Sequence, residues 1–445
     1  MIMNKKMTVA SWAANPSRSC LCALLVFAVL PTTALAEALE SETLEQRVVR
    51  LEQSLAERDA STKSAAGATE YAFGGYIKLD AIASQYSDGE RALASVGDDF
   101  LVPSVIPVGG ESGDTNLDMH AKHSRIWFKT STNTEMGLIT SYYEMDFGIN
   151  QIGDERISNS AASRIRHAYV NWQYDTNSAL LAGQSWSTFF NVGSLPDTLD
   201  FVGPVGTLFE RQAQLRWTRT LASGRSVMLA VENPSSGLYG ENGSAAGGNA
   251  YDNNALPDMV LRYNGKAGDF SYSLAGMLRE ITYKQNFINS QAQAIVGDDS
   301  VYGYGLSFAG VWQLGKDDIR LQLNAGSALG RYLGLQTYRD GVIEDNGDVE
   351  LIDSVGGFVA YRHFWAPKWR SSLVLSASSA DNPSTVAATT AASYQSVHAN
   401  LIYAPVAALN FGVEYIHASK TIEQPINGDD SGDIDRLQFS AKYIF

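Results

Sequence analysis

The chain has 445 residues, and its 48 acidic side chains outnumber the 33 lysines and arginines, which gives a formal net charge of −15 at pH 7. A chain this acidic is poorly suited to the phosphate backbone of DNA or RNA, so we expect no nucleic-acid partner. The negative charge does not exclude a channel for anions, because selectivity depends on the charges at the narrowest point of a pore.

The first 36 residues have the features of a secretory signal peptide. Basic residues precede an apolar run at residues 21–30, and Ala34-Leu35-Ala36 offers a cleavage site of small residues. The apolar run is too short for a membrane-spanning helix, which needs about 20 residues. Both cysteines, Cys20 and Cys22, lie within this segment. We therefore expect an exported mature chain without a disulfide or a thiolate site.

Residues 37–59 are predicted to form a short periplasmic coiled-coil helix. Apolar residues recur there as an a/d stripe among Glu, Gln and Arg, at Leu44, Val48, Leu51 and Leu55. Isolated helices of this length are marginally stable in water. Two interpretations stay open, a coiled coil that helps three subunits to associate and a single amphipathic helix. Residues 60–70 are rich in Ser, Ala and Gly and are predicted to form a flexible linker.

From residue 71 to the end, the sequence contains sixteen segments in which apolar and polar residues alternate. A period of two places the two kinds of residue on opposite faces of a β-strand. The last segment ends the chain on an aromatic residue, as outer-membrane barrels do, and its apolar face consists of Leu437, Phe439, Ala441, Tyr443 and Phe445. Short turns alternate with long loops, among them residues 281–301, 331–351 and 420–435.

This layout is that of an outer-membrane barrel. The predicted fold is all-β, a transmembrane antiparallel β-barrel of about 16 strands over residues 71–445, preceded by the short N-terminal coiled-coil helix. The predicted location is the outer membrane of a Gram-negative bacterium, where membrane lipid and lipopolysaccharide are the surrounding partners.

Seven basic side chains of these strands, on inward faces or beside the constriction loop, are the predicted substrate pathway. They are Lys78, Arg125, Arg164, Arg166, Arg211, Arg216 and Arg262. Guanidinium groups attract carboxylates and stay charged at any relevant pH. Arg164 and Arg166 share strand parity with apolar residues, and a lipid-facing arginine costs about 2–4 kcal/mol, so we expect them in the lumen or at the rim. The alternative is that these cations pair with Asp80, Glu144 and Asp146 and only stiffen the wall.

The segment at residues 191–206 is the predicted constriction loop. It is punctuated by Gly and Pro, yet it carries apolar residues that need a packing partner. Folding into the barrel would supply that partner and would narrow the channel beside Arg211 and Arg216. The residues assigned to this constriction are Leu195, Pro196, Asp197, Asp200 and Phe201.

Four stretches of sequence carry a family resemblance. They are Phe73-Gly74-Gly75-Tyr76-Ile77-Lys78-Leu79-Asp80-Ala81, Ser163-Arg164-Ile165-Arg166-His167-Ala168-Tyr169, Gly183-Gln184-Ser185-Trp186-Ser187, and Leu195-Pro196-Asp197-Thr198-Leu199-Asp200-Phe201 followed by Arg211-Gln212. Together they resemble the DcaP-like trimeric outer-membrane porin family, and the loop motif is the most specific of them. The resemblance implies a homotrimer of 16-stranded channels for passive uptake of small anionic solutes, especially dicarboxylates and aromatic acids.

We find neither a catalytic motif nor a metal-binding motif in the sequence. Gly305-Leu306-Ser307-Phe308-Ala309 lacks the final glycine of a nucleophile elbow. His120 and His123 are three residues apart, so on one continuous strand they would face opposite sides and could not share a metal ion. We therefore expect no catalytic residue, no cofactor and no metal. The alternative functions are a general diffusion porin and a structural barrel tethered by its coiled coil.

Overall fold

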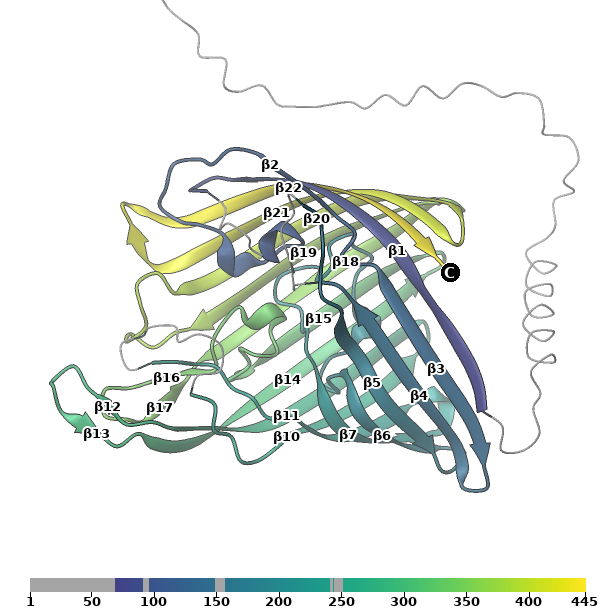
Figure 1. Cartoon of the computed structure of the whole chain (residues 1–445), viewed down its shortest axis with the longest axis horizontal. Coiled ribbons are helices and arrows are strands. Elements are labelled where there is room, and N and C mark those ends of the chain that lie inside the picture. Colours follow the sequence, from purple (N-terminus) through teal and green to yellow (C-terminus); the bar gives the residue numbers. More distant parts are fainter. Residues whose placement is uncertain (1–68, 91–95, 149–156, 241–242, 244–250) are drawn as a thin grey trace, which may run out of the picture. The chain divides into compact units, whose positions relative to one another are not determined.

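The computed structural model describes residues 69–90, 96–148, 157–240, 243 and 251–445 (Figure 1). The predicted signal peptide and coiled coil, and nearly all of the predicted linker, lie outside these residues. Among the described residues, no helix is long and apolar enough to cross a membrane. The helical elements described are short 3-10 turns, namely η1 (Val96–Asp98), η2 (Pro103–Val105), η3 (Val192–Ser194), η4 (Ala222–Gly224) and η5 (Gly334–Gln336).

The described chain forms one closed antiparallel barrel, and the predicted all-β barrel of sixteen strands is confirmed. The barrel strands are β1 (Thr69–Tyr86), β3 (Arg125–Thr134), β4 (Gly137–Asp146), β5 (Arg164–Gln173), β6 (Ser178–Trp186), β7 (Arg211–Thr220), β8 (Ser226–Glu232), β10 (Asp258–Ala267), β11 (Phe270–Lys284), β14 (Asp298–Leu314), β15 (Asp317–Ser327), β18 (Asp353–Ala366), β19 (Trp369–Asp381), β20 (Ala391–Val406), β21 (Leu409–Ile426) and β22 (Asp429–Ile444). Each strand pairs with its neighbours in the sequence, and β1 pairs with β22 to close the ring.

The second barrel strand is interrupted. Its first part, β2 (Asn116–His120), pairs with the Asp80–Ser84 part of β1, and its second part, β3, pairs with the first half of β1. Residues 121–124 form a break between the two parts. The remaining short strands lie in loops, and they are β9 (Leu238–Tyr239), β12 (Phe287–Ile288), β13 (Ala294–Ile295), β16 (Gly341–Ile343) and β17 (Val349–Leu351).

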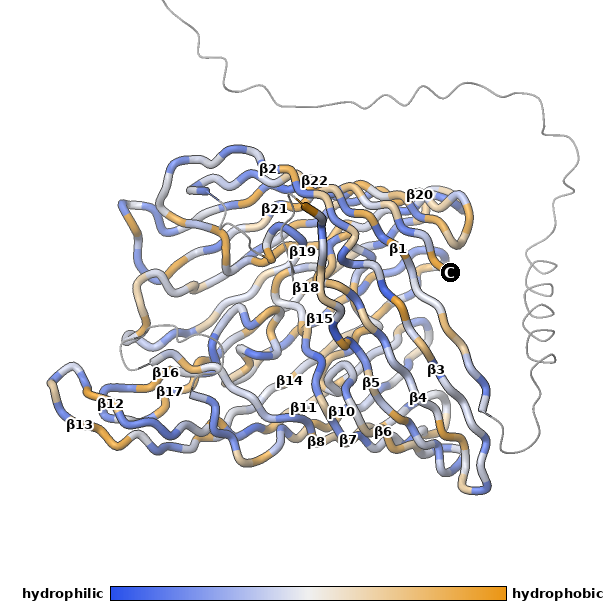
Figure 2. The backbone as a smooth tube through the Cα atoms, in the orientation of Figure 1, coloured by the Kyte–Doolittle hydropathy of each residue, from blue (hydrophilic) through white to orange (hydrophobic). Residues whose placement is uncertain are grey.

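The strands alternate between an apolar outer face and a polar inner face, and Figure 2 shows this alternation of colour along the tube. On β22, Leu437 and Phe439 are 52% and 44% exposed on the outside, whereas Gln438 and Ser440 are buried inside. The outer face therefore suits lipid and the inner face suits water, as a membrane barrel requires.

The prediction of a long loop at residues 420–435 is wrong. β21 and β22 continue through most of it and are joined by Asn427 and Gly428, whose φ angles are 54° and 101°. Two consecutive positive φ angles define a tight hairpin turn that Asn-Gly favours. The strands β11 and β14 likewise extend into the loop predicted at residues 281–301.

Candidate functional site

A bulge in β5 resolves the parity conflict of its arginines. The register between β4 and β5 shifts at Glu144 and Met145, so that two consecutive residues of β5, Arg166 and His167, both have buried side chains. Ile165 before the bulge and Val170 after it are exposed on the outer face. The extra residue of a bulge re-aims the side chains that follow it. Both Arg164 and Arg166 therefore point into the barrel while the apolar residues after them face outwards.

These two arginines form a network with the acidic side chains of β4. Arg164 donates from Nε to Asp146 at 2.6 Å. Arg166 donates to Glu144 and to Asp146, in each case at 2.7 Å. Arg125 on β3 approaches Glu144 at 3.3 Å. Because both carboxylates are almost fully buried, they need these cations to compensate their charge.

Lys78 is also paired. Its Nζ lies 3.0 Å from Asp80 and donates to the carbonyl oxygen of Leu199 at 2.8 Å. Four of the predicted pathway cations, Lys78, Arg125, Arg164 and Arg166, thus have a carboxylate partner on the inner wall. For these four cations, the structure contains the ion pairs with Asp80, Glu144 and Asp146 that the sequence analysis gave as the alternative to a substrate pathway.

Three further pathway cations lack such a partner. Arg211 and Arg216 on β7 and Arg262 on β10 form no ion pair within 4.0 Å with any described residue. Arg211 lies over the ring of Trp186, with its guanidinium carbon 4.4 Å from the ring centre. Arg262 donates to the carbonyl oxygen of Phe190 at 2.9 Å and to Asn264 at 2.7 Å. All three side chains are partly buried, so each is a positive charge of the wall without an ion-pair partner among the described residues.

The segment between β6 and β7 contacts inward-facing side chains on the opposite wall. The backbone amides of Leu199 and Asp200 donate to Glu414 of β21, at 2.7 and 3.2 Å. Asn324 of β15 donates to the carbonyl oxygen of Gly206 at 3.0 Å. Because β15 and β21 lie across the barrel from β6 and β7, this segment runs through the interior.

The five residues assigned to the predicted constriction are held by different partners. Asp197 accepts from Nε of Arg370 at 2.6 Å and lies 3.7 Å from Arg362. The Asp200 carboxylate accepts from backbone amides, including that of Leu101 at 2.7 Å, and burial raises its pKa. Leu195 packs against the main apolar cluster, and its carbonyl oxygen accepts from Arg320 at 2.7 Å. Pro196 is partly buried beside it.

Phe201 has the most contacts with the charged groups of the wall. Its ring stacks on His123 with centres 4.4 Å apart. The guanidinium carbons of Arg164 and Arg166 lie 5.6 and 5.2 Å from the centre of its ring, within the range of cation–π contacts. The segment and the arginine network are therefore one packed unit.

A second loop also enters the barrel, and sequence reasoning missed it. Within the connection between β15 and β18, Tyr332 and Leu333 are fully buried. The carbonyl oxygen of Tyr332 accepts from Phe209 at 3.1 Å, and Leu333 forms an isolated bridge with Leu208. The β15–β18 loop thus packs at Tyr332 and Leu333 on the end of the β6–β7 segment. The adjacent large apolar residues Tyr332 and Leu333 were the available signal, because a loop exposed to water has little use for them.

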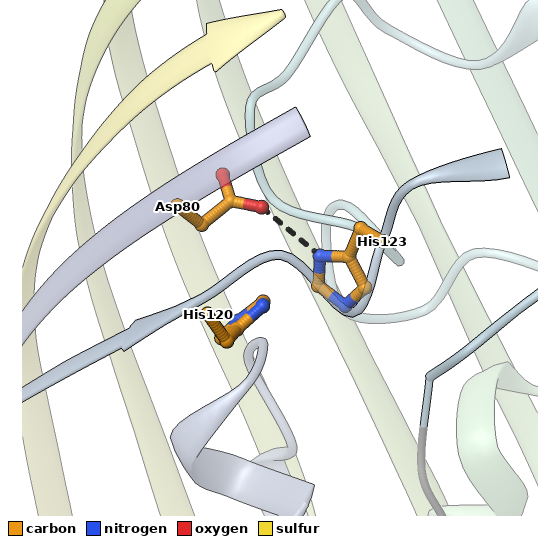
Figure 3. A group of neighbouring side chains, drawn as sticks. All are labelled: Asp80, His120 and His123. Atoms are coloured by element: carbon orange, nitrogen blue, oxygen red, sulfur yellow. Dashed lines mark hydrogen bonds and ion pairs between the residues drawn. The ribbon is translucent and has the colours of Figure 1, made fainter. Parts of the chain in front are cut away.

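The prediction that His120 and His123 face opposite sides is wrong. The strand breaks between them, so both side chains lie beside Asp80 of β1 (Figure 3). Nδ1 of His123 is 3.1 Å from an oxygen of Asp80, and the two imidazole rings are 4.6 Å apart. The rule of alternation holds only for a continuous strand.

Comparison with known proteins gives one family and a set of solved barrels. The model of a family described as DcaP outer membrane protein matches residues 38–445. No curated protein matches the chain.

The solved barrels include an outer-membrane channel, a porin and a further outer-membrane protein. The channel DcaP of Acinetobacter baumannii has a TM-score of 0.68 at 22% identity, over 86% of this chain and 99% of that one. The anion-selective porin from Comamonas acidovorans has a TM-score of 0.55 at 9% identity, over 85% and 100%. The trimer form of OmpT of Vibrio cholerae has a TM-score of 0.53 at 12% identity, again over 85% and 100%. At such identities the likeness shows the shared barrel fold.

Proposed function

The chain belongs to the DcaP outer membrane protein family and is a channel protein of the Gram-negative outer membrane, and we propose from this that it takes up small anionic solutes by passive diffusion. The observation that carries the proposal is the group formed by Arg211, Arg216 and Arg262. Arg216 and Arg262 face the interior, and Arg211 lies at the start of β7 against Trp186 and Phe209. None of the three has a carboxylate partner within ion-pair distance among the described residues. A passing carboxylate can replace the missing partner.

The surroundings of this cationic group favour carboxylates that carry an aromatic ring. Arg211 lies over the ring of Trp186 and near that of Phe209, so a solute that reaches its guanidinium group also meets aromatic side chains. Arginine binds a carboxylate through two parallel hydrogen bonds, which fixes the orientation of the solute. The dicarboxylates and aromatic acids that the family resemblance implies fit both features.

The inserted β6–β7 segment supports a narrow passage beside the arginines. Its first residues give Arg262 a backbone partner through Phe190, and its last residues place Phe209 5.5 Å from Arg211. A solute that passes between this segment and the wall would meet the uncompensated charges at short range, where water screens them least. In this proposal Leu195, Pro196, Asp197, Asp200 and Phe201 shape the passage, and the arginines select the charge.

The proposal includes a homotrimer in the outer membrane. The trimer form of the Vibrio cholerae OmpT barrel and the resemblance to a trimeric family support it. The predicted coiled coil at residues 37–59 would assist association. Lipid and lipopolysaccharide would cover the remaining apolar outer surface, which carries large side chains such as Leu306 and Leu323.

The first test is single-channel conductance in a planar bilayer, with the reversal potential measured under a salt gradient. We expect conductance in steps of three, anion selectivity, and transient block by added phthalate or succinate. Arg216→Gln should reduce the anion preference several-fold, because it removes one uncompensated charge. The matched control is Arg219→Gln on the same strand, since Arg219 is 42% exposed at the turn end of β7 and pairs with Asp175.

Two outcomes would favour the alternatives. A cation-selective pore that diacids do not block would contradict the role of the arginines and would indicate a general diffusion porin. Folded protein that passes no current would indicate a structural barrel tethered by its N-terminal segment.

A further inference from the structure

The break in the second barrel strand brings three potential metal ligands together. Asp80 comes from β1, His120 ends β2, and His123 lies in the break (Figure 3). One oxygen of Asp80 and one ring nitrogen of each histidine lie within 4.8 Å of one another. All three side chains are buried, and those of Asp80 and His123 are fully so.

The environment of His120 prepares one nitrogen to bind a metal ion. Its Nε2 lies 3.2 Å from the carbonyl oxygen of Asp99, and this contact requires Nε2 to carry the proton. The lone pair is therefore on Nδ1, which is buried and has no hydrogen-bond partner in the part of the chain that the structure describes. Histidines that bind metal ions commonly donate their other ring nitrogen to a backbone carbonyl in this way.

His123 and Asp80 share a hydrogen bond that a bound ion would replace, and Nε2 of His123 is buried without a hydrogen-bond partner among the described residues. Nδ1 of His123 is 3.1 Å from Oδ2 of Asp80. With bonds of about 2.0–2.1 Å, neighbouring ligands of a tetrahedral zinc site are roughly 3.3 Å apart. One nitrogen of His120 lies within 4.8 Å of the other two ligand atoms, so it needs to move inwards by up to about 1.5 Å.

The other oxygen of Asp80 is already held by its neighbours. Oδ1 accepts from Gln438 at 2.8 Å and from the hydroxyl of Ser440, and Lys78 approaches it at 3.0 Å. These contacts fix the carboxylate and leave Oδ2 facing His123. Lys78 also brings a positive charge close to the site, which opposes the binding of a cation.

We propose that Asp80, His120 and His123 bind one divalent transition-metal ion of the Zn²⁺ class, with water as the fourth ligand. Two imidazoles and one carboxylate suit Zn²⁺, Co²⁺, Ni²⁺ or Cu²⁺. Ca²⁺ and Mg²⁺ need more oxygen ligands than this pocket offers. Because Lys78 weakens the attraction, the site binds more weakly than a structural zinc site built from thiolates.

Metal binding would act on the β6–β7 segment through a direct contact. The ring of Phe201 stacks on the ring of His123, with an angle of 17° between their planes. An ion that fixes the His123 ring therefore also restrains Phe201, and it joins β1 to the break between β2 and β3.

The test is a titration of the full chain, without an affinity tag and in detergent, with Co²⁺. Tetrahedral Co²⁺ has strong visible absorption bands, so binding is read without any measurement of transport. We expect one Co²⁺ per chain and loss of the bands when Zn²⁺ displaces it. His120→Asn should weaken binding at least about tenfold. Lys78→Met should tighten it, because the opposing charge is removed.

The control is His417→Gln on β21. His417 also faces an aspartate, Asp435 at 3.0 Å, but it is 42% exposed, and Asp435 lies opposite Gln85, five residues along β1 from Asp80. Its removal should therefore leave Co²⁺ binding unchanged. Wild-type protein without the absorption bands at millimolar Co²⁺ would overturn the proposal, as would a His120→Asn variant that binds equally well. His123→Gln is the second variant. Because His123 is fully buried, this substitution can prevent folding, and the test then rests on His120→Asn. The result is independent of whether the channel selects anions.

Discussion

At the scale of single residues, strand parity predicts which face a side chain occupies but not which partner it finds. Lys78, Arg216 and Arg262 point inwards as the alternation indicated. Whether an inward arginine is paired depends on the register between strands. Arg164 lies directly opposite Asp146, whereas Arg216 lies opposite Leu181 on one side and Ala230 on the other. Strand periodicity in a single sequence does not predict which residues of neighbouring strands lie opposite each other.

Removing the charge of Asp146 should release positive charge into the lumen. In Asp146→Asn, Arg164 and Arg166 lose their shared carboxylate, so we expect a larger anion preference in the reversal potential. The free energy of unfolding should fall by about 1.5–3 kcal/mol, because charged hydrogen bonds of a buried group are weakened. The matched control is Asp175→Asn, since Asp175 is 44% exposed and its ion pair with Arg219 lies at the surface. Equal reversal potentials for Asp146→Asn and wild type would contradict the expectation.

At the scale of elements, the sequence predicts regular segments well and their irregularities poorly. The apolar residues of the segment at 191–206 indicated that it must pack on something, and Leu199 indeed lies against Gly412 on the opposite wall. The parity conflict of Arg164 and Arg166 was the signal of the bulge in β5, whereas the break at residues 121–124 had no comparable signal. Both irregularities determine the site, since one assembles the histidine cluster and the other turns Arg166 inwards.

Glu414 is the main anchor of the inserted segment, and weakening it should loosen the passage. Its two oxygens accept the amides of Leu199 and Asp200, and glutamine keeps only one acceptor. Glu414→Gln should increase open-channel current noise and mean conductance, measured on single channels. Glu423→Gln is the control, because Glu423 is an exposed residue of the same strand that pairs with Asn382. Conductance traces identical to wild type would mean that the segment is held by its other contacts.

At the scale of the whole molecule, sixteen alternating segments were sufficient to predict a closed barrel. Outward apolar and inward polar residues have one stable arrangement in a membrane, since an open sheet edge cannot face lipid. What fills the interior was less predictable. Loop residues carry no strand period, and the burial of Tyr332 depends on partners from β7, β10 and the β6–β7 segment, which only the fold brings together.

Tyr332 joins these distant parts, so its hydroxyl should contribute to the stability of the entire barrel. The hydroxyl donates to the fully buried Asp258 at 2.6 Å and accepts from Gln212 at 2.8 Å. Tyr332→Phe leaves both groups short of a partner and should lower the free energy of unfolding by about 1–3 kcal/mol, measured by denaturant titration in detergent. Tyr361→Phe removes a similar hydrogen bond, to Asp317 at 2.7 Å, but on an exposed residue, where water replaces the lost partner. Equal losses in the two variants would show that the inserted loop does not stabilise the barrel. A loss confined to Tyr332→Phe would show that the loop packed inside the lumen is part of what holds the wall together.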